Sequence, residues 1–447
     1  MLSREENECL TRTGPGTPMG KLFRSYWLPV LLSEQLAEPA GGQVRVKVLG
    51  EELLAFRDSK GRVGLVEPRC PHRGANLYFA RNEEGGLRCV FHGWKFDVQG
   101  NCLEMPTMPP ERYATLCEKA RIKAYPVREY AGYVWAWMGG GAEPELPQLE
   151  FALVPPSHRY VSKKLQECNW AQAAEGGVDT AHFSFLHQPV THTEADLLEK
   201  SPRATKGYAK ETMSHEHVRW MRDDTRPRYE VRAHEAGLVL AGCRDAGPGE
   251  HYWRIAQYLM PSHAYTPSAT PGQTYHAQCW VPIDDESCWV FVYSWNPDRP
   301  LTAEERDSYR KGGAVYPELD ADWKPLRNRS NEYLLDRRLQ KTENYTGIIG
   351  VSEQDAAIQD SQGRIADRTR EMLGATDLGV VRFRRLMLDA AKAVAAGGDA
   401  PAAAAPGAYR VRAGGIVTRA EVPFDEVMRM RFGDALGFIR DKGEEVR

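Results

Sequence analysis

The sequence has no apolar run of about 18 residues, so we expect no membrane-spanning helix. The first ten residues, MLSREENECL, are charged and lack the apolar stretch of a secretory signal. Neither sign of charge is in excess, because 58 Lys and Arg face 61 Asp and Glu. Nucleic acid and anionic membranes are therefore not indicated as partners, and we expect a cytoplasmic protein.

The nine cysteines do not form an even, closely spaced framework. An odd number of scattered cysteines in a long chain without a signal indicates a reducing compartment and argues against disulfides. Two of them belong to the motif described below. We expect the other seven, Cys102 and Cys117 included, to be reduced and mostly buried.

A chain of 447 residues predicts two to three domains. Residues 1–40 read as an irregular arm followed by a strand or short helix that packs on the next domain. From Val44 the sequence forms short strands separated by turn signals, and a Gly/Pro-rich stretch at 139–148 marks a boundary. The second domain has a strand-rich section, predicted from HEHVRWMRD (215–223) to SCWVFVYSW (287–295), between helical blocks, which favours an α+β fold.

Late helices are predicted at 302–311 and over most of 330–396. The Ala/Gly/Pro-rich segment 389–410 is predicted to be a loosely ordered loop or crossover. Residues 421–443 read as an amphipathic terminal helix.

The strand-rich first domain contains the pattern C-x-H, sixteen residues, and C-x2-H, formed by Cys70, His72, Cys89 and His92. Two thiolates on one iron and two imidazoles on the other are the ligands of a Rieske [2Fe-2S] cluster. Two alternatives are a Cys2His2 zinc site, whose usual spacing is different, and four ordinary buried side chains. The spacing and the flanking glycines favour the Rieske cluster.

The second candidate site lies in the segment Cys168–His187. As a helix, it would place Glu175, Asp179 and His182 on one face, with His187 about 140° further round. Both imidazoles then reach one metal only if the helix ends, kinks or bulges near 183–186. Two imidazoles and a distant carboxylate would form the triad of a non-haem Fe(II) oxygenase. The alternative is a polar helix with two satisfied histidines.

The third metal ligand is not settled by the residues alone. Asp355 lies just inside a predicted helix start and is a candidate ligand. The stretch from Ser352 to Asp355 also fits a capping box, in which the carboxylate only accepts backbone N–H groups. Glu353 and Asp360 are rival ligands.

Four stretches occur in an informative order: CPHRGA, CVFHGWKFD, DTAHFSFLH and QDAAIQDSQG. Together they resemble the α subunits of Rieske non-haem iron oxygenases, in the phthalate-dioxygenase-like branch, over nearly the whole chain. One departure is Gln362, where the family often has Met. The resemblance implies an arm (1–40), a Rieske β-sandwich domain (41–148) and a catalytic domain (149–447) of the helix-grip (Bet v 1/START-like) type with an antiparallel sheet.

The resemblance also implies the roles of single residues. Those implied to bind the cluster are Cys70, His72, Cys89 and His92, and those implied to bind the mononuclear iron are His182, His187 and Asp355. Asp179 is implied to bridge His92 of one subunit and His182 of its neighbour. The alternative for Asp179 is a carboxylate that only orients His182.

As function, the resemblance implies the terminal oxygenase of a multicomponent system. Electrons from NAD(P)H would arrive through a separate flavin/iron-sulfur reductase, and O2 would hydroxylate an aromatic carboxylate such as phthalate or phenoxybenzoate, with cis-dihydroxylation as the first expectation. The implied assembly is a head-to-tail homotrimer or two stacked trimers. An anionic substrate needs a cationic anchor, for which Arg244 is the first choice among Arg203, Arg219, Arg232, Arg244 and Arg254.

Two alternative functions stay open. One is a Rieske monooxygenase or demethylase of a methoxylated aromatic, because it would use the same ligands. The other is a Rieske electron carrier without catalysis, which would have no use for His182, His187 and Asp355.

Overall fold

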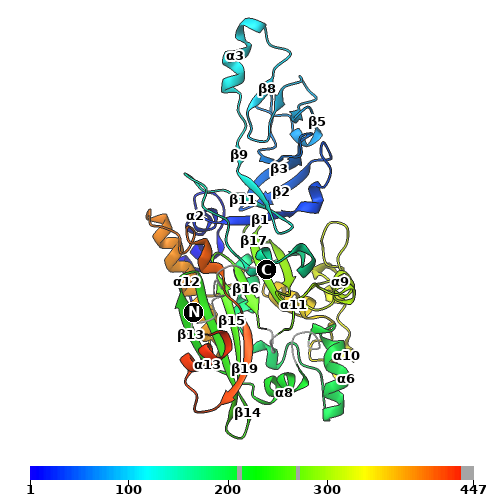
Figure 1. Ribbon diagram of the computed structural model, residues 1–447, viewed down its shortest axis with the longest axis vertical. Coiled ribbons are helices and arrows are strands. Elements are labelled where there is room, and N and C mark those ends of the chain that lie inside the picture. Colours follow the sequence, from blue (N-terminus) through cyan, green and yellow to red (C-terminus); the bar gives the residue numbers. More distant parts are fainter. Residues whose placement is uncertain (209–213, 268–271, 434–447) are drawn as a thin grey trace.

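The computed structural model of the chain describes residues 1–208, 214–267 and 272–433. Figure 1 shows a narrow upper part, coloured mostly blue and cyan, above a broader lower part that holds most of the helices. In the residues that are described, no helix combines the length and the apolar character needed to cross a membrane.

The upper part contains two four-stranded antiparallel sheets. The first has the order β2 (Val44–Val48), β3 (Glu51–Arg57), β4 (Val63–Val66) and β9 (Ala124–Tyr125); the second has the order β5 (Arg81–Glu83), β6 (Gly86–Arg88), β7 (Lys95–Phe96) and β8 (Cys102–Glu104). Strand β2 alternates, with Val46 and Val48 buried and Arg45 and Lys47 exposed, as a half-buried strand should. The helix α3 (Pro110–Lys119) lies at the upper tip (Figure 1).

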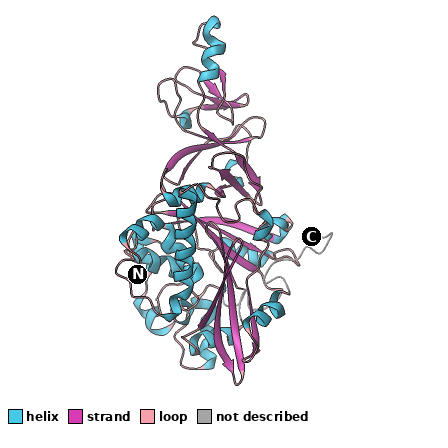
Figure 2. Ribbon diagram, turned by 90° about the vertical axis from the view of Figure 1, so that its left-hand side faces the viewer, coloured by secondary structure: helices cyan, strands magenta, loops and turns pink. Residues whose placement is uncertain are grey.

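The lower part is built on an eight-stranded antiparallel sheet. Its order is β12 (Arg159–Gln166), β18 (Cys288–Trp295), β17 (Tyr275–Pro282), β16 (His263–Thr266), β15 (Glu250–Leu259), β14 (Gly237–Gly247) and β13 (Arg228–His234), and β19 (Gly414–Arg419) also pairs with β15. The helix α5 (Trp170–Val178) packs on β15, β16 and β17, and the long helix α12 (Leu378–Ala395) packs on α5, β13 and β14. Figure 2 shows the layer of helices beside the strands. A sheet gripping a long helix is the catalytic fold that the resemblance implied.

Shorter helices complete the lower part. They are α4 (Glu150–Leu153), α6 (Glu194–Ala204), α8 (His215–Asp223), α9 (Ala303–Arg310), α10 (Arg337–Thr342), α11 (Val351–Ser361) and α13 (Phe424–Phe432). The 3-10 turns are η1 (Ser33–Leu36), η2 (Leu77–Phe79), η3 (Pro156–His158), η4 (His182–Ser184), η5 (Arg329–Leu334), η6 (Ala375–Asp377) and η7 (Pro406–Tyr409).

The N-terminal arm forms α1 (Arg4–Thr11), α2 (Pro18–Arg24) and β1 (Trp27–Leu32). Its two helices pack on α12, and the ring of Phe23 meets that of Trp170 edge-on at 4.8 Å. Strand β1 forms a three-stranded sheet with β11 (Tyr133–Trp137) and β10 (Val127–Tyr130), and the turn η1 that follows it packs on β3. The arm thus contacts both parts, because its two helices pack on the lower part while β1 and η1 pack on strands of the upper part.

Several elements differ from the sequence prediction. Residues 215–223 form a helix instead of a strand, because the buried His217, Val218 and Met221 repeat with helical spacing. Strand β19 was not predicted, and the first part of the expected loop at 389–410 continues α12 to Ala395. The predicted terminal helix begins as α13, and its part beyond residue 433 lies outside the described residues.

The expectation of seven reduced cysteines is wrong for two of them. A disulfide joins Cys102 on β8 to Cys117 on α3, with Cα atoms 5.3 Å apart. The two lie 15 residues apart in the sequence, and the return of α3 to β8 brings them together, which residue spacing alone does not reveal.

Candidate functional site

The two Cys/His loops of the upper part have the same backbone geometry. In each loop the cysteine carbonyl accepts a hydrogen bond from a glycine N–H, Gly74 to Cys70 at 2.8 Å and Gly93 to Cys89 at 2.9 Å. Both glycines have positive φ, +73° and +77°, which favours glycine. The sequence therefore forms two matching tight turns that present a cysteine and a histidine each.

The four side chains of these loops converge. The His72 and His92 rings have centroids 4.4 Å apart, and His72 stacks on Trp94 at 4.5 Å. The Nδ1 atoms of both histidines are buried without a hydrogen-bond partner, and both cysteines are buried. Burial raises the pKa of Cys70 to about 11, so a thiolate here needs compensating positive charge. Two thiols and two inward-facing ring nitrogens match the donor set of a Rieske cluster.

The second cluster forms where α5 ends. The helix ends at Val178, Asp179 is its C-cap, and a short 3-10 turn carries His182. This break comes earlier than the predicted one at 183–186, and it brings the rings of His182 and His187 to 5.0 Å. Helix α11 supplies Asp355, whose Oδ1 lies 3.2 Å from His187 Nε2 and 3.7 Å from His182 Nε2.

These three side chains have the geometry of a metal site. Their ligand atoms all lie within 4.8 Å of one another. The Nε2 atom of His187 is buried without a hydrogen-bond partner, whereas its Nδ1 lies 2.7 Å from Gln354 Oε1. Gln354 is itself fixed, because its Nε2 donates to Ala204 O at 3.1 Å and Ile348 O at 2.8 Å. The amide oxygen thus holds the His187 proton on Nδ1 and leaves Nε2 free for a metal.

Asp179 contacts the same cluster from behind. Its Oδ2 lies 3.5 Å from His182 Nδ1, and its Oδ1 accepts hydrogen bonds from Ala181 N at 2.7 Å and Tyr229 Oη at 3.4 Å. Burial alone raises the pKa of Asp179, but His182 and the backbone N–H groups lower it overall, so the carboxylate is charged. About 24% of its side chain remains exposed, which leaves one edge accessible.

The rival carboxylates have other partners. Glu353 pairs with Lys206 Nζ at 3.4 Å, and Asp360 accepts a short hydrogen bond from Tyr333 Oη. Glu175 pairs with Arg368 and Arg384. Within the described residues, His182, His187 and Asp355 form the one group of three such side chains whose ligand atoms all lie within 4.8 Å of one another.

A cavity opens beside this cluster. Its lining includes Lys164, Gln166, Asp179, His182, Phe183, Arg254, Trp280 and Asp355. Arg254 lies over the Phe183 ring at 4.0 Å, and its Nε is buried without a partner. The cavity therefore combines an aromatic wall with a cation that has hydrogen-bonding capacity left.

Arg244, the predicted anchor, does not line this cavity. Its Nη2 donates to Thr180 O at 2.7 Å and its Nε to Asp224 O at 3.1 Å, so the guanidinium links two backbone segments. Among the five arginines that the sequence offers as anchors, Arg254 is the one that lines this cavity.

Comparisons with known proteins cover nearly the whole chain. Residues 26–128 match the family described as Rieske [2Fe-2S] domain, and residues 136–419 match LigXa C-terminal domain like. The 3-chlorobenzoate-3,4-dioxygenase oxygenase subunit of Comamonas testosteroni is 39% identical over 90% of this chain and 91% of the relative. The phthalate 4,5-dioxygenase oxygenase subunit of Pseudomonas putida is 40% identical over 90% and 88%.

Among solved structures, the Pseudomonas putida CBB5 NdmA QL mutant with theobromine aligns with a TM-score of 0.56 and 15% identity. The alignment covers 91% of this chain and 99% of that one. At this level of identity the likeness shows a shared fold.

Proposed function

The chain belongs to the Rieske non-haem iron oxygenases, and on that basis we propose that it is the terminal oxygenase that hydroxylates an aromatic carboxylate, with cis-dihydroxylation as the expected outcome. The observation that carries the proposal is the cluster of His182, His187 and Asp355, which opens onto a cavity that also holds Arg254. We assign residues 41–148 to the Rieske domain and 149–447 to the catalytic domain; two family matches, over 26–128 and 136–419, support a division into two domains.

The enzyme uses a Rieske cluster and a mononuclear iron, and the donor sets fit both. We assign the cluster to Cys70, His72, Cys89 and His92, and the iron to His182, His187 and Asp355. When bound, these groups supply single-electron storage and dioxygen activation. Because His182 and Asp355 also line the cavity, an iron held by these residues would be accessible to substrate and dioxygen from the cavity.

Asp179 is suited to connect the two centres. Its carboxylate lies 3.5 Å from His182 Nδ1, and its exposed edge can accept the Nε2–H of an incoming His92. A bond at each oxygen fixes both tautomers and both ring orientations. Aspartate is short enough to hold both rings close, and its charge is retained because its pKa is lowered.

The chain's own Rieske loops do not reach its own iron site. Figure 1 places β5 and β8 in the upper part, far from α11 in the lower part. The bridge therefore requires the upper part of a neighbouring subunit. A head-to-tail contact of this kind closes in a cyclic assembly, so we propose a homotrimer or two stacked trimers. Electrons would come from NAD(P)H through a separate reductase.

The substrate class follows from the cavity. Arg254 offers its unpartnered Nε to a carboxylate, and Phe183 and Trp280 provide aromatic surface for a ring. Guanidinium binds carboxylate through parallel charge-assisted hydrogen bonds. An aromatic ring with an acidic group would thus be held with its other carbons toward the metal ligands.

A product assay under 18O2 tests this function. The purified protein, a family-type reductase and NADH would be supplied with phthalates, chlorobenzoates, phenoxybenzoates and methoxybenzoates. The proposal predicts a product with two labelled oxygens and two added hydrogens. Loss of a methyl group would indicate demethylation instead, and NADH consumption without any organic product on this panel would contradict the substrate class.

A further inference from the structure

The last turn of α5 contains two adjacent glycines, Gly176 and Gly177, which only Val178 separates from Asp179. A Cβ at 177 would lie 2.8 Å from both the Trp280 ring and Ala264 Cβ, whereas a Cβ at 176 would require the end of the Gln359 side chain to move. Glycines weaken a helix because they leave the backbone free. The end of α5, which sets the place of Asp179, must therefore be held by other contacts.

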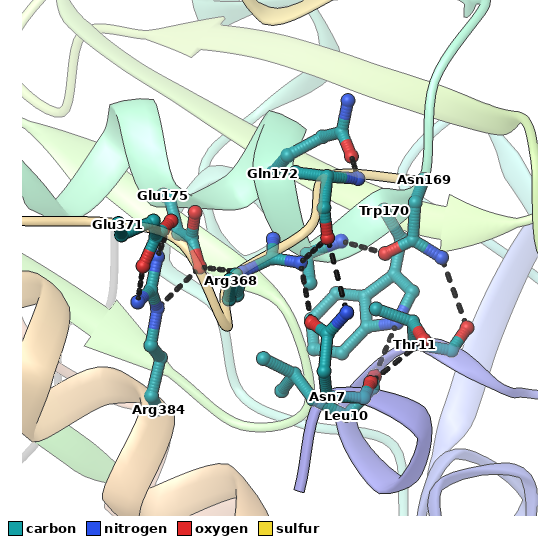
Figure 3. Close-up of polar contacts among 12 residues, drawn as sticks. Asn7, Leu10, Thr11, Asn169, Trp170, Gln172, Glu175, Arg368, Glu371 and Arg384 are labelled. Carbon is teal, nitrogen blue, oxygen red and sulfur yellow. Dashed lines mark hydrogen bonds and ion pairs between the residues drawn. The ribbon is translucent and has the colours of Figure 1, made fainter. Parts of the chain in front are cut away.

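Glu175 provides such a contact, one residue before the glycines. Its Oε1 accepts hydrogen bonds from Arg368 Nε at 2.9 Å and from Arg384 Nε at 2.7 Å. The Arg368 side chain is fully buried and that of Arg384 is 4% exposed. Figure 3 shows both guanidiniums meeting this carboxylate. Burial alone raises the pKa of Glu175, but the two arginines lower it overall, so the carboxylate is charged.

The network joins four parts of the chain at one point. Arg384 belongs to α12, and it also pairs through both Nη atoms with Glu371. Arg368 lies in the segment between α11 and α12, and its Nη1 donates to Asn7 Oδ1 of the N-terminal arm at 3.2 Å (Figure 3). The end of α5 is thus tied to the arm, to α12 and to the segment that follows the helix of Asp355.

We propose that Glu175 is a positioning residue: clamped by Arg368 and Arg384, it fixes the end of α5 and so holds Asp179 beside His182. The inference rests on the proposed bridging role of Asp179. Loss of Glu175 should disturb Asp179 more than the metal ligands Asp355 and His187, because Asp355 lies on a separate helix and His187 is held by Gln354.

A double-mutant comparison tests whether Glu175 affects electron transfer through Asp179. Glu175→Gln keeps the shape of the side chain and removes its charge. We expect it to retain about three irons per chain and an unchanged cluster spectrum. Reoxidation of the reduced cluster in a single turnover should slow at least about tenfold. The double variant with Asp179→Asn should be no slower than Asp179→Asn alone, because Glu175 acts through Asp179.

Hydrogen exchange tests, without turnover, whether Glu175 fixes the end of α5. In Glu175→Gln, amides 176–182 should exchange faster while those of α11 stay unchanged. The matched control is Glu150→Gln, which removes a buried carboxylate from Arg412 Nε, 2.9 Å from both oxygens, elsewhere in the domain. The control should lower stability without changing exchange at 176–182 or the reoxidation rate.

Either of two results would overturn the inference: exchange that rises uniformly, as in the control, or slowing that adds to that of Asp179→Asn. If Glu175→Gln does not fold, Arg384→Lys tests the same link, since it keeps the charge but loses the planar fork; it should show the same local exchange to a smaller degree. Reoxidation at the wild-type rate in Asp179→Asn alone would refute the bridge, and the exchange result would still decide the positioning role.

Discussion

Among single residues, Gln354 orients the metal ligand His187 without being a ligand itself. Its amide oxygen holds the Nδ1–H of His187, and its amide nitrogen is fixed by two backbone carbonyls. Loss of such an outer partner typically lowers metal affinity about 10–100-fold. We expect Gln354→Ala to bind Fe(II) that much more weakly, measured by titration of the protein stripped of mononuclear iron. Unchanged affinity would show that the backbone alone orients His187.

The two buried arginines near Thr180 should give opposite results. Arg254→Gln removes the cavity cation, so kcat/KM for carboxylate substrates should fall about 10–100-fold, the equivalent of a charged hydrogen bond. Arg244→Gln leaves the carbonyls of Thr180 and Asp224 underbonded, so it should lower the free energy of unfolding by about 1–3 kcal/mol. Steady-state kinetics and urea unfolding of both variants separate the roles. A larger effect of Arg244→Gln on KM would show that Arg244, and not Arg254, binds the substrate carboxylate.

The residue types of the site could be predicted from the sequence, but some of their partners could not. The capping box that competed for Asp355 does not form: the N-cap of α11 is Gly350, and Ser352 Oγ accepts from Lys164 Nζ. The partners of Ser352 and Asp355 depend on which face of α11 packs against the sheet, and the local sequence does not determine that face. Likewise, strand patterns place Arg244 and Arg254 inside but do not say which one reaches the cavity.

At the level of elements, the sequence predicted the break between the two histidines but put it too late. The helical period of the sequence does not show where α5 ends. Gly176 and Gly177 lie in the last turn because Gln359 and Trp280 approach them closely, and these contacts come from distant parts of the chain. The strand predicted at 215–223 has little support from residue preference, because HEHVRWMRD contains only one Val and one Trp, and the burial of His217, Val218 and Met221 on one face is typical of a helix.

The disulfide between β8 and α3 gives a prediction at the same scale. Titration of free thiols in the denatured, cluster-free protein should find seven, and nine after reduction, matching the seven cysteines that are free in the structure. Replacing both Cys102 and Cys117 with Ser should destabilise the upper part by about 3 kcal/mol, the loop-entropy value for a 15-residue separation. Thermal unfolding followed by the visible absorption of the cluster measures this. Nine thiols before reduction would mean that the pair does not form.

For the whole molecule, the placement of the two centres makes assembly part of the chemistry. The Rieske loops and α11 lie in different parts of the subunit (Figure 1). If the bridge is formed between subunits, activity should depend on protein concentration below the dissociation constant of the assembly. Mixing a His92-substituted chain with a His182-substituted chain should restore some turnover, since mixed assemblies contain one intact pair. Two inactive variants that stay inactive when mixed would argue for a bridge within one chain.

The stability of the molecule should depend on pH through four histidines, of which His217, His263 and His276 are buried and His234 is half-buried. Burial lowers the pKa of His217, His234 and His276 to about 4 and that of His263 to about 3. In the unfolded chain these imidazoles titrate near pH 6.5, so below that pH the unfolded state binds more protons, and the stability present above pH 6.5 is lost as the pH falls toward 4. From pH 7.5 to 5.5 each should remove about 1.4 kcal/mol, or about 5 kcal/mol together. Urea unfolding at the two pH values measures this loss, and His263→Gln should reduce it by about a quarter. An equal loss in the variant would show that His263 does not remain neutral in the folded protein.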